Sequence, residues 1–225
     1  MNYTSLFLDL DDTLLDFLKA EYYAVKDALK CHSLPFDDKT VKLYSQINIS
    51  FWECFERGEI EKSEIFEGRF CELMQRLGLE CNIKSLSDTY CNKLADQSFK
   101  IDGAEDLLKY LKSKGYKVYV TTNGSAAIQH KRIKNSGLGV YFDKVFLSEE
   151  INFQKPAKEY FDYCINHIEE KDKSKILIIG DSQSSDILGG INSGIDTCWY
   201  NPKNKTPKYK SRFEINDLSE IKSIL

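Results

Sequence analysis

The feature that most constrains the fold of this chain is a change in the spacing of its apolar residues near residue 99. Between about residues 16 and 99, apolar side chains recur every three or four positions, as on one face of a helix. Beyond residue 99, helical stretches of this kind alternate with short apolar runs. This alternation is typical of a doubly wound, Rossmann-like α/β fold, in which helices cover both faces of a parallel sheet.

The spacing predicts the positions of the individual elements. In the first region, four amphipathic helices are expected around residues 18–29, 44–55, 66–77 and 86–94. In the second, helices are expected over 104–114, 126–136, 158–168 and 184–193, alternating with strands over 117–121, 144–147, 175–179 and 197–200. A further buried strand is predicted at 3–8, where YTSLFL runs into acidic residues.

The strand at 3–8 must belong to the later sheet, because one strand followed by four helices has no core of its own. The chain is therefore expected to form a Rossmann-like core from residues 1–15 and 100–225. A helical bundle formed by residues 16–99 would be inserted into this core.

Composition excludes several classes of protein. With 225 residues, 42% of them hydrophobic and 12% aromatic, the chain is long and apolar enough for a globular core. Its net charge of -4 argues against a nucleic-acid-binding protein, which needs a concentrated basic face. Seven scattered cysteines without a CxxC pair are expected to be reduced: Cys31, Cys54, Cys71, Cys81, Cys91, Cys164 and Cys198.

The sequence gives no sign of a membrane protein. No run approaches the roughly 18 to 20 apolar residues that a membrane span needs. The first residues, MNYTSLFLDLDDT, carry acids where a signal peptide would carry Lys or Arg. We therefore expect a cytoplasmic protein, either a monomer or a homodimer.

Polar residues follow the predicted strands at the points where the apolar runs end. Ligands of open α/β sheets bind at this edge, so these side chains are expected to converge. They include acids, a hydroxyl, an amide and a lysine: Asp9, Asp11, Thr122, Asn123, Lys155, Asp181 and Asp186.

This set of residues predicts a metal and phosphate site. In extended backbone, Asp9 and Asp11 point to the same side, and Asp181 arrives from a neighbouring strand. Carboxylates crowded in this way favour a hard cation such as Mg²⁺, and no His or Cys clusters with them to favour zinc. Lys155, the Thr122 hydroxyl and the backbone N–H groups around Asn123 would then bind an anionic phosphate.

Four motifs, in order, make the chain resemble the haloacid dehalogenase (HAD) superfamily of phosphohydrolases: FLDLDDTLLD, VTTNG, QKP and GDSQSSD. The helical insert then resembles that superfamily's type 1 cap domain. The resemblance implies that Asp9 is the nucleophile, which becomes an aspartyl phosphate, and that Asp11 is the general acid and base.

The same resemblance implies the remaining roles in the site. The metal would be held by the carboxylates of Asp9 and Asp181 and by the backbone carbonyl of Asp11, with Asp186 supporting them. Thr122, Asn123 and Lys155 would bind the phosphoryl group. A phosphate ester needs a proton on its leaving alkoxide and a carbon–halogen bond does not, so the acid at Asp11 favours a phosphatase over a dehalogenase.

Longer stretches, such as FWECFERGEI and VTTNGSAAIQHKRIKNSGL, resemble the pyrimidine 5'-nucleotidase subfamily. This implies a nucleoside monophosphate as substrate, and Phe17 and Trp52 are candidates to stack on its base. At helical spacing, these two aromatic residues also fit the core of the bundle.

Three alternatives remain open. They are a sugar-phosphate phosphatase, a β-phosphoglucomutase-like phosphomutase and a non-catalytic binding protein on the same fold. The basic segment 201–212 is expected to be a solvated surface loop, and the alternative is a contact with substrate or a partner.

Overall fold

A computed structural model describes residues 3–225, so the first two residues of the expected core segment 1–15 lie outside the described part. The chain divides into two compact units. One comprises the described residues up to Asp16 together with Phe99–Leu225, and the other is Phe17–Ser98. We call them the core unit and the helical unit and describe each by itself.

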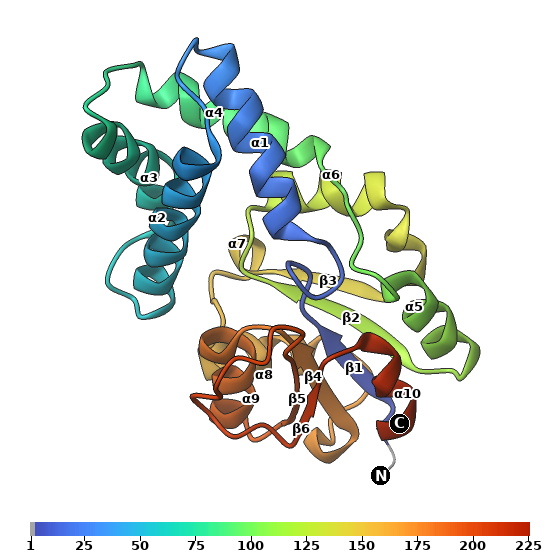
Figure 1. Cartoon of the computed structure of the whole chain (residues 1–225). Coiled ribbons are helices and arrows are strands. Elements are labelled where there is room, and N and C mark those ends of the chain that lie inside the picture. The colour runs from blue at the N-terminus through green and yellow to red at the C-terminus, as the bar shows by residue number, and fades with distance from the viewer. Residues whose placement is uncertain (1–2) are drawn as a thin grey trace. The chain divides into compact units, whose positions relative to one another are not determined.

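The core unit is built on a six-stranded parallel sheet in the order β3-β2-β1-β4-β5-β6 (Figure 1). The strands are β1 (Ser5–Leu8), β2 (Lys117–Thr122), β3 (Lys144–Leu147), β4 (Ile176–Gly180), β5 (Asp196–Tyr200) and β6 (Phe213–Ile215). The first strand therefore lies in the middle of the sheet, between strands that come more than a hundred residues later. The predicted doubly wound sheet is confirmed.

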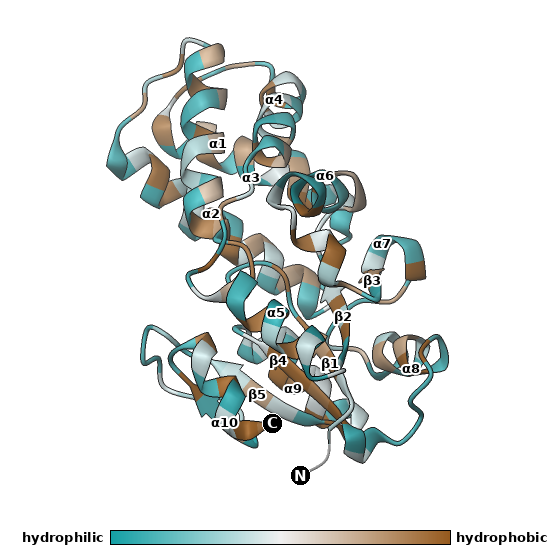
Figure 2. Cartoon of the chain, turned by 90° about the vertical axis from the view of Figure 1, so that its right-hand side faces the viewer, coloured by the Kyte–Doolittle hydropathy of each residue, from teal (hydrophilic) through white to brown (hydrophobic). Residues whose placement is uncertain are grey.

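Helices cover both faces of this sheet because its strands are apolar on both sides. On one face, Leu6 and Leu8 of β1 pack in a cluster with Leu107 of α5 (Ala104–Ser113) and Ile133 of α6 (Ala126–Ser136). On the other face, Phe7 packs in a cluster with residues of α8 (Lys158–Asn166). Figure 2 colours β4 in apolar brown, whereas teal is frequent on the surrounding helices.

The segment after β4 differs from the expected helix over 184–193. It begins with a π-helical turn, Gln183–Ile187, and continues as α9 (Leu188–Ser193). The turn is closed by the Ile187 N–H, which donates to the carbonyl of Ser182 at 3.2 Å. Single π-helical turns of this kind are frequent at functional sites.

Besides short 3-10 turns, two helices and one strand were not predicted. These are β6 at the edge of the sheet, α7 (Ser148–Ile151) and α10 (Ile221–Ile224). Each has three or four residues, which is too short to show a period.

The backbone passes between the two units through a pair of adjacent segments. Leu15 and Lys100 form an antiparallel bridge. On either side of it, the Asp16 N–H donates to the Phe99 carbonyl at 2.9 Å and the Ile101 N–H donates to the Leu14 carbonyl at 3.0 Å. The outgoing and returning chains are therefore held together within the core unit.

The helical unit consists of α1 (Phe17–Cys31), α2 (Asp38–Glu56), α3 (Lys62–Leu77) and α4 (Ile83–Asp96). An aromatic cluster fills its centre, where the rings of Tyr44, Phe70 and Tyr90 have centroids 5.0 to 5.4 Å apart. Such ring pairs stabilise beyond the area they bury. Among residues 3–225, none of the helices combines the length and the apolar character that a membrane span requires.

Candidate active site

The site lies where the three central strands end. β1 runs directly into Asp9, whose N–H donates to the carbonyl of Ile179 in β4 at 2.9 Å. β2 ends at Thr122, and β4 ends at Gly180, one residue before Asp181. Since β1 lies between β2 and β4, the sheet brings the ends of all three strands together.

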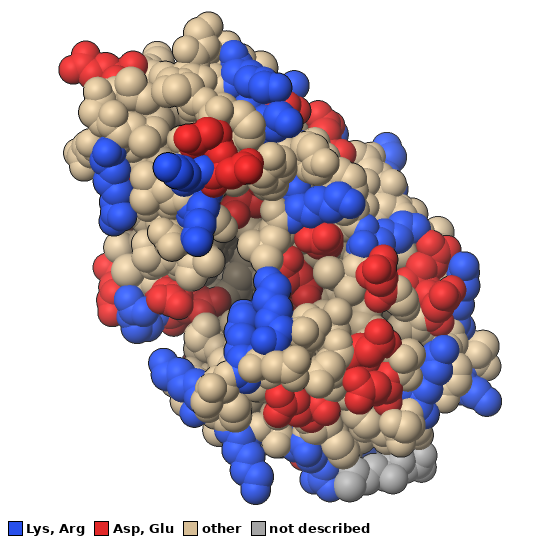
Figure 3. Space-filling model, viewed as in Figure 1, with Lys and Arg blue, Asp and Glu red and all other residues tan. Residues whose placement is uncertain are grey.

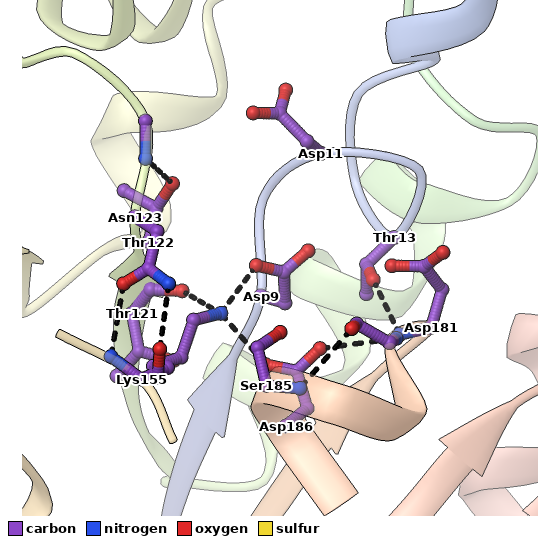
Figure 4. A network of polar contacts seen from close by, with 12 residues as sticks. Asp9, Asp11, Thr13, Thr121, Thr122, Asn123, Lys155, Asp181, Ser185 and Asp186 are labelled. Atoms are coloured by element: carbon purple, nitrogen blue, oxygen red, sulfur yellow. Dashed lines mark hydrogen bonds and ion pairs between the residues drawn. The ribbon is translucent and has the colours of Figure 1, made fainter. Parts of the chain in front are cut away.

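Lys155 is the cation of the site and is almost fully buried. Its ammonium group donates to Asp9 Oδ1 at 2.7 Å, to Asp186 Oδ1 at 2.6 Å and to the Thr121 carbonyl at 3.0 Å (Figure 4). Burial alone would lower the pKa of Lys155, but the charges of Asp186 and Asp9 outweigh it and raise that pKa. Lys155 is therefore a fixed positive charge against the Asp9 carboxylate.

Three carboxylates form what we call the acid cluster: Asp9, Asp181 and Asp186. One carboxylate oxygen from each lies within 4.8 Å of the others. Burial raises the pKa of Asp9 to about 7, against the opposing charge of Lys155. Burial, followed by the charges of Asp9 and Asp12, raises the pKa of Asp181 well above its usual range.

The acid cluster is short of positive charge, because one ammonium group faces three carboxylates, and burial makes that imbalance costly. A cation among the three oxygen groups would relieve this imbalance. The donor set consists of hard oxygen atoms, which is what Mg²⁺ prefers, so the residues present fit that ion. Asp186, expected only as support, lies within the acid cluster itself.

Gly180 makes room for Asp186. A Cβ atom at position 180 would lie 2.2 Å from Asp186 Oδ2. This distance is too short for two non-bonded atoms, so any residue with a side chain would clash with Asp186. The π-helical turn that follows brings Asp186 back against the end of β4, where its Oδ2 accepts from the Ser182 N–H at 3.2 Å. The GDSQSSD motif therefore begins with glycine for a steric reason.

The backbone of Asp181 is held at both ends by residues that the sequence analysis did not single out. Its N–H donates to Thr13 Oγ1 at 3.2 Å, and its carbonyl accepts from Trp199 Nε1 at 2.8 Å. Thr13 lies in the first motif, so its position was a usable signal. For Trp199, the last apolar strand gave no sign of a polar role.

Asn123 and Thr122 supply different functions at the end of β2. Both polar atoms of the Asn123 side chain bond the backbone of Lys155, at 2.9 Å each. The Asn123 side chain therefore positions Lys155. Binding of the phosphate by the backbone N–H of Asn123 remains a prediction. Thr122 Oγ1 accepts from the Gly124 N–H and from Gln129 Nε2, both at 3.1 Å. Because both acceptor positions are taken, the Thr122 hydroxyl is left to act as a donor.

Asp11 lies apart from the acid cluster, and its carboxylate is turned away from that of Asp9 (Figure 4). Its Oδ2 accepts from Gln129 Nε2 at 2.6 Å and its Oδ1 accepts from Arg132 Nη1. Neither partner was predicted from the sequence. They occur three residues apart in the predicted helix 126–136, so their shared helix face was visible in the sequence.

The two candidate base-stacking residues belong to the helical unit. Phe17 begins α1 and is partly exposed. Trp52 in α2 is also partly exposed and packs edge to face on Phe55, with ring centroids 5.8 Å apart. A contact between either ring and a nucleobase stays a prediction.

The chain is similar in sequence to several known proteins. The profile of the family described as haloacid dehalogenase-like hydrolase matches residues 6–200. Pyrimidine 5'-nucleotidase PynA of Streptococcus pneumoniae is 40% identical over 202 residues, which cover 90% of this chain and 85% of PynA. Pyrimidine 5'-nucleotidase YjjG of Escherichia coli is 30% identical over 227 residues, which cover 100% of this chain and 99% of YjjG.

A solved structure is also similar over the whole chain. The crystal structure of HAD-hydrolase YfnB from Bacillus subtilis, bound to magnesium, has a TM-score of 0.95 and 37% identity. The match covers 100% of this chain and 99% of YfnB. The family profile, the relatives and the fold lead to the same conclusion: this chain belongs to the haloacid dehalogenase-like hydrolase family.

Proposed function

We propose that this hydrolase is a magnesium-dependent phosphatase that removes the 5'-phosphate from nucleoside monophosphates, with pyrimidine nucleotides preferred. The observation that carries the proposal is the contact of Asp9 Oδ1 with the Lys155 ammonium at 2.7 Å within the acid cluster, while Asn123 at the end of β2 holds the Lys155 backbone. This arrangement suits attack on a phosphoryl group. The similarity to PynA and YjjG supports the choice of substrate.

The first step transfers the phosphoryl group to the protein. An Asp9 carboxylate oxygen attacks phosphorus, the bond from phosphorus to the ester oxygen breaks, and the leaving alkoxide takes a proton from the Asp11 carboxyl group. The Lys155 charge stabilises the negative charge on the phosphoryl oxygens, and the Thr122 hydroxyl donates a hydrogen bond to one of them. When bound, Mg²⁺ supplies a Lewis acid that neutralises further negative charge there.

The second step restores the protein. Asp11, now a carboxylate, takes a proton from water as that water attacks the phosphorus of the aspartyl phosphate. The bond between phosphorus and the Asp9 oxygen breaks, which frees Asp9 and inorganic phosphate. Asp11 enters the first step protonated and the second step ionised, whereas Asp9 forms and then loses its bond to phosphorus.

The test is a panel of phosphate esters assayed with Mg²⁺ and with EDTA. It should contain pyrimidine and purine nucleoside monophosphates, glucose 6-phosphate and p-nitrophenyl phosphate. We expect the highest kcat/KM on pyrimidine nucleotides and no turnover in EDTA. Asp9→Asn should abolish turnover and keep the wild-type melting temperature within a few degrees.

Each alternative has its own outcome in this panel. Faster turnover of glucose 6-phosphate than of the nucleotides would indicate a sugar-phosphate phosphatase. Interconversion of glucose phosphates in the presence of a bisphosphate activator would indicate a mutase. Absence of turnover on every ester would indicate a binding protein, and full turnover by Asp9→Asn would refute the covalent mechanism.

A further inference from the structure

The contacts of Asp11 lead to an inference that rests on the proposed phosphatase and deepens it. We propose that Gln129 and Arg132 are positioning residues, which hold the Asp11 carboxylate on the α6 side of the site. There it can exchange a proton with the leaving oxygen. No motif of the sequence analysis assigned either residue a role.

The Asp11 carboxylate is held by one donor on each oxygen. Gln129 Nε2 bonds Oδ2 at 2.6 Å, and Arg132 Nη1 bonds Oδ1. Both donors come from α6, three residues apart and therefore on one face of the helix. Separate donors on the two oxygens fix the rotation of the carboxylate as well as its place.

The two donors also orient each other. Arg132 Nη1 donates to Gln129 Oε1 at 3.0 Å, which determines which end of the Gln129 amide is the nitrogen. That nitrogen then has one hydrogen for Asp11 and one for Thr122 Oγ1, at 2.6 and 3.1 Å. A single amide group thus links the acid and base to the hydroxyl expected on the phosphate.

Burial makes this arrangement rigid. The Arg132 side chain has no exposed surface, whereas the Asp11 side chain is 28% exposed. A guanidinium in such surroundings needs a negative partner, and Asp11 provides one. Gln129 is confined from the other side as well, since a Cβ at Gly124 would lie 2.2 Å from its Nε2.

The direction in which Asp11 is held suits its proposed role. In an in-line displacement, the leaving oxygen stands opposite the attacking oxygen across phosphorus. An acid that serves the leaving oxygen must therefore lie away from Asp9, and the Asp11 carboxylate is turned away from Asp9 (Figure 4). Without Gln129 and Arg132, nothing described above would keep it there.

The test compares two leaving groups in single-turnover experiments with excess enzyme. Uridine 5'-monophosphate releases a nucleoside alkoxide, which needs a proton, whereas p-nitrophenyl phosphate releases an aryl oxide, which does not. The variants are Arg132→Met, Arg132→Lys and Gln129→Met. Methionine is close in size to glutamine, and it removes both N–H donors of the Gln129 amide. Lys134→Met is the control, because Lys134 is exposed on the same helix and carries the same charge.

We expect Arg132→Met and Gln129→Met to slow uridine release by at least about tenfold, since general acid catalysis contributes about 10²- to 10⁴-fold. The rate of p-nitrophenolate release should change by less than about threefold, because this leaving group needs no proton from Asp11. Arg132→Lys should recover part of the loss, and Lys134→Met should match the wild type on both esters.

An equal loss of activity on both esters would show that Gln129 and Arg132 have a merely structural role. Unchanged uridine release by Arg132→Met and by Gln129→Met would show that Asp11 does not need these two residues to hold it. Either result overturns the inference while the wild type still turns over. If the wild type itself hydrolyses neither ester, the proposed function has failed instead.

Discussion

Replacement of Lys155 by methionine tests the electrostatics of the site most directly. The change keeps an unbranched apolar stem but removes an ammonium group with three hydrogen bonds, two of them to the carboxylates of Asp9 and Asp186. The Lys155 side chain is only 2% exposed, so water does not screen these contacts. Removing one partner of a buried ion pair costs about 3–5 kcal/mol in the free energy of unfolding.

That cost translates into a measurable thermal shift. In domains of 150–250 residues, each 1 kcal/mol lowers Tm by about 2–4 °C, so Lys155→Met should melt roughly 6–20 °C below the wild type at pH 8. Thermal unfolding followed by circular dichroism in EDTA measures this shift. The matched control is Lys158→Met, because the Lys158 side chain is 54% exposed and its ion pair contributes little.

The shift should depend on pH. Burial raises the pKa of Asp9 to about 7, and Lys155 is the group that opposes a further rise. Below pH 7, Asp9 is mostly protonated in the folded wild type, so the loss of Lys155 does not leave an Asp9 charge without a partner. Above pH 7, Asp9 is ionised and the loss is felt in full. We expect a clearly smaller deficit at pH 5 than at pH 8.

Two results would refute this reasoning. One is a Lys155→Met protein that melts with the wild type at pH 8. The other is a deficit of the same size at pH 5 and pH 8, which would mean that lost packing is the cause. The double variant with Asp186→Asn adds a check, since removing one of the stranded carboxylates should recover part of the lost stability.

Two further predictions concern the metal and the substrate. Mg²⁺ should raise Tm, and it should do so by more at pH 8 than at pH 5.5. The pKa values of Asp9 and Asp181 are raised, and both carboxyl groups must lose their protons to bind the ion. Differential scanning fluorimetry measures the rise in Tm, and an Asp181→Asn protein with an undiminished rise would contradict the prediction. Trp52→Ala should reduce the ratio of kcat/KM values between pyrimidine and purine nucleotides by roughly two- to twelvefold, since stacking contributes about 0.5–1.5 kcal/mol, and should leave p-nitrophenyl phosphate turnover unchanged. Equal losses on all esters would mean that Trp52 only packs on Phe55.

The parts of the fold that were predictable are those with a period. The alternation of helices and strands located β2 to β5, and the apolar run before Asp9 located β1. The rule that parallel strands deliver polar groups to one edge predicted that Asp9, Lys155 and Asp181 lie together. Composition gives only the balance of the two signs of charge, whereas their interspersion on the face that Figure 3 displays is a property of the fold.

The parts that escaped prediction depend on contacts between distant residues. Asp11 and Arg132 are 121 positions apart, and Asp181 and Trp199 meet across two strands, so no local pattern reports either pair. The π-helical turn before α9 escaped for another reason. Its residues fit an ordinary helix equally well, and only the need to place Asp186 against Gly180 distinguishes the two.

The paired segments at Leu15 and Lys100 have a consequence for how such a protein diversifies. They fix the two ends of residues 17–98 at the spacing of neighbouring strands, about 5 Å. Any independently folding module whose own ends meet at that spacing can be grafted there without disturbing the register of the sheet. A different module at this place would leave the ends of β1, β2 and β4, and with them Lys155 and the acid cluster, where they are.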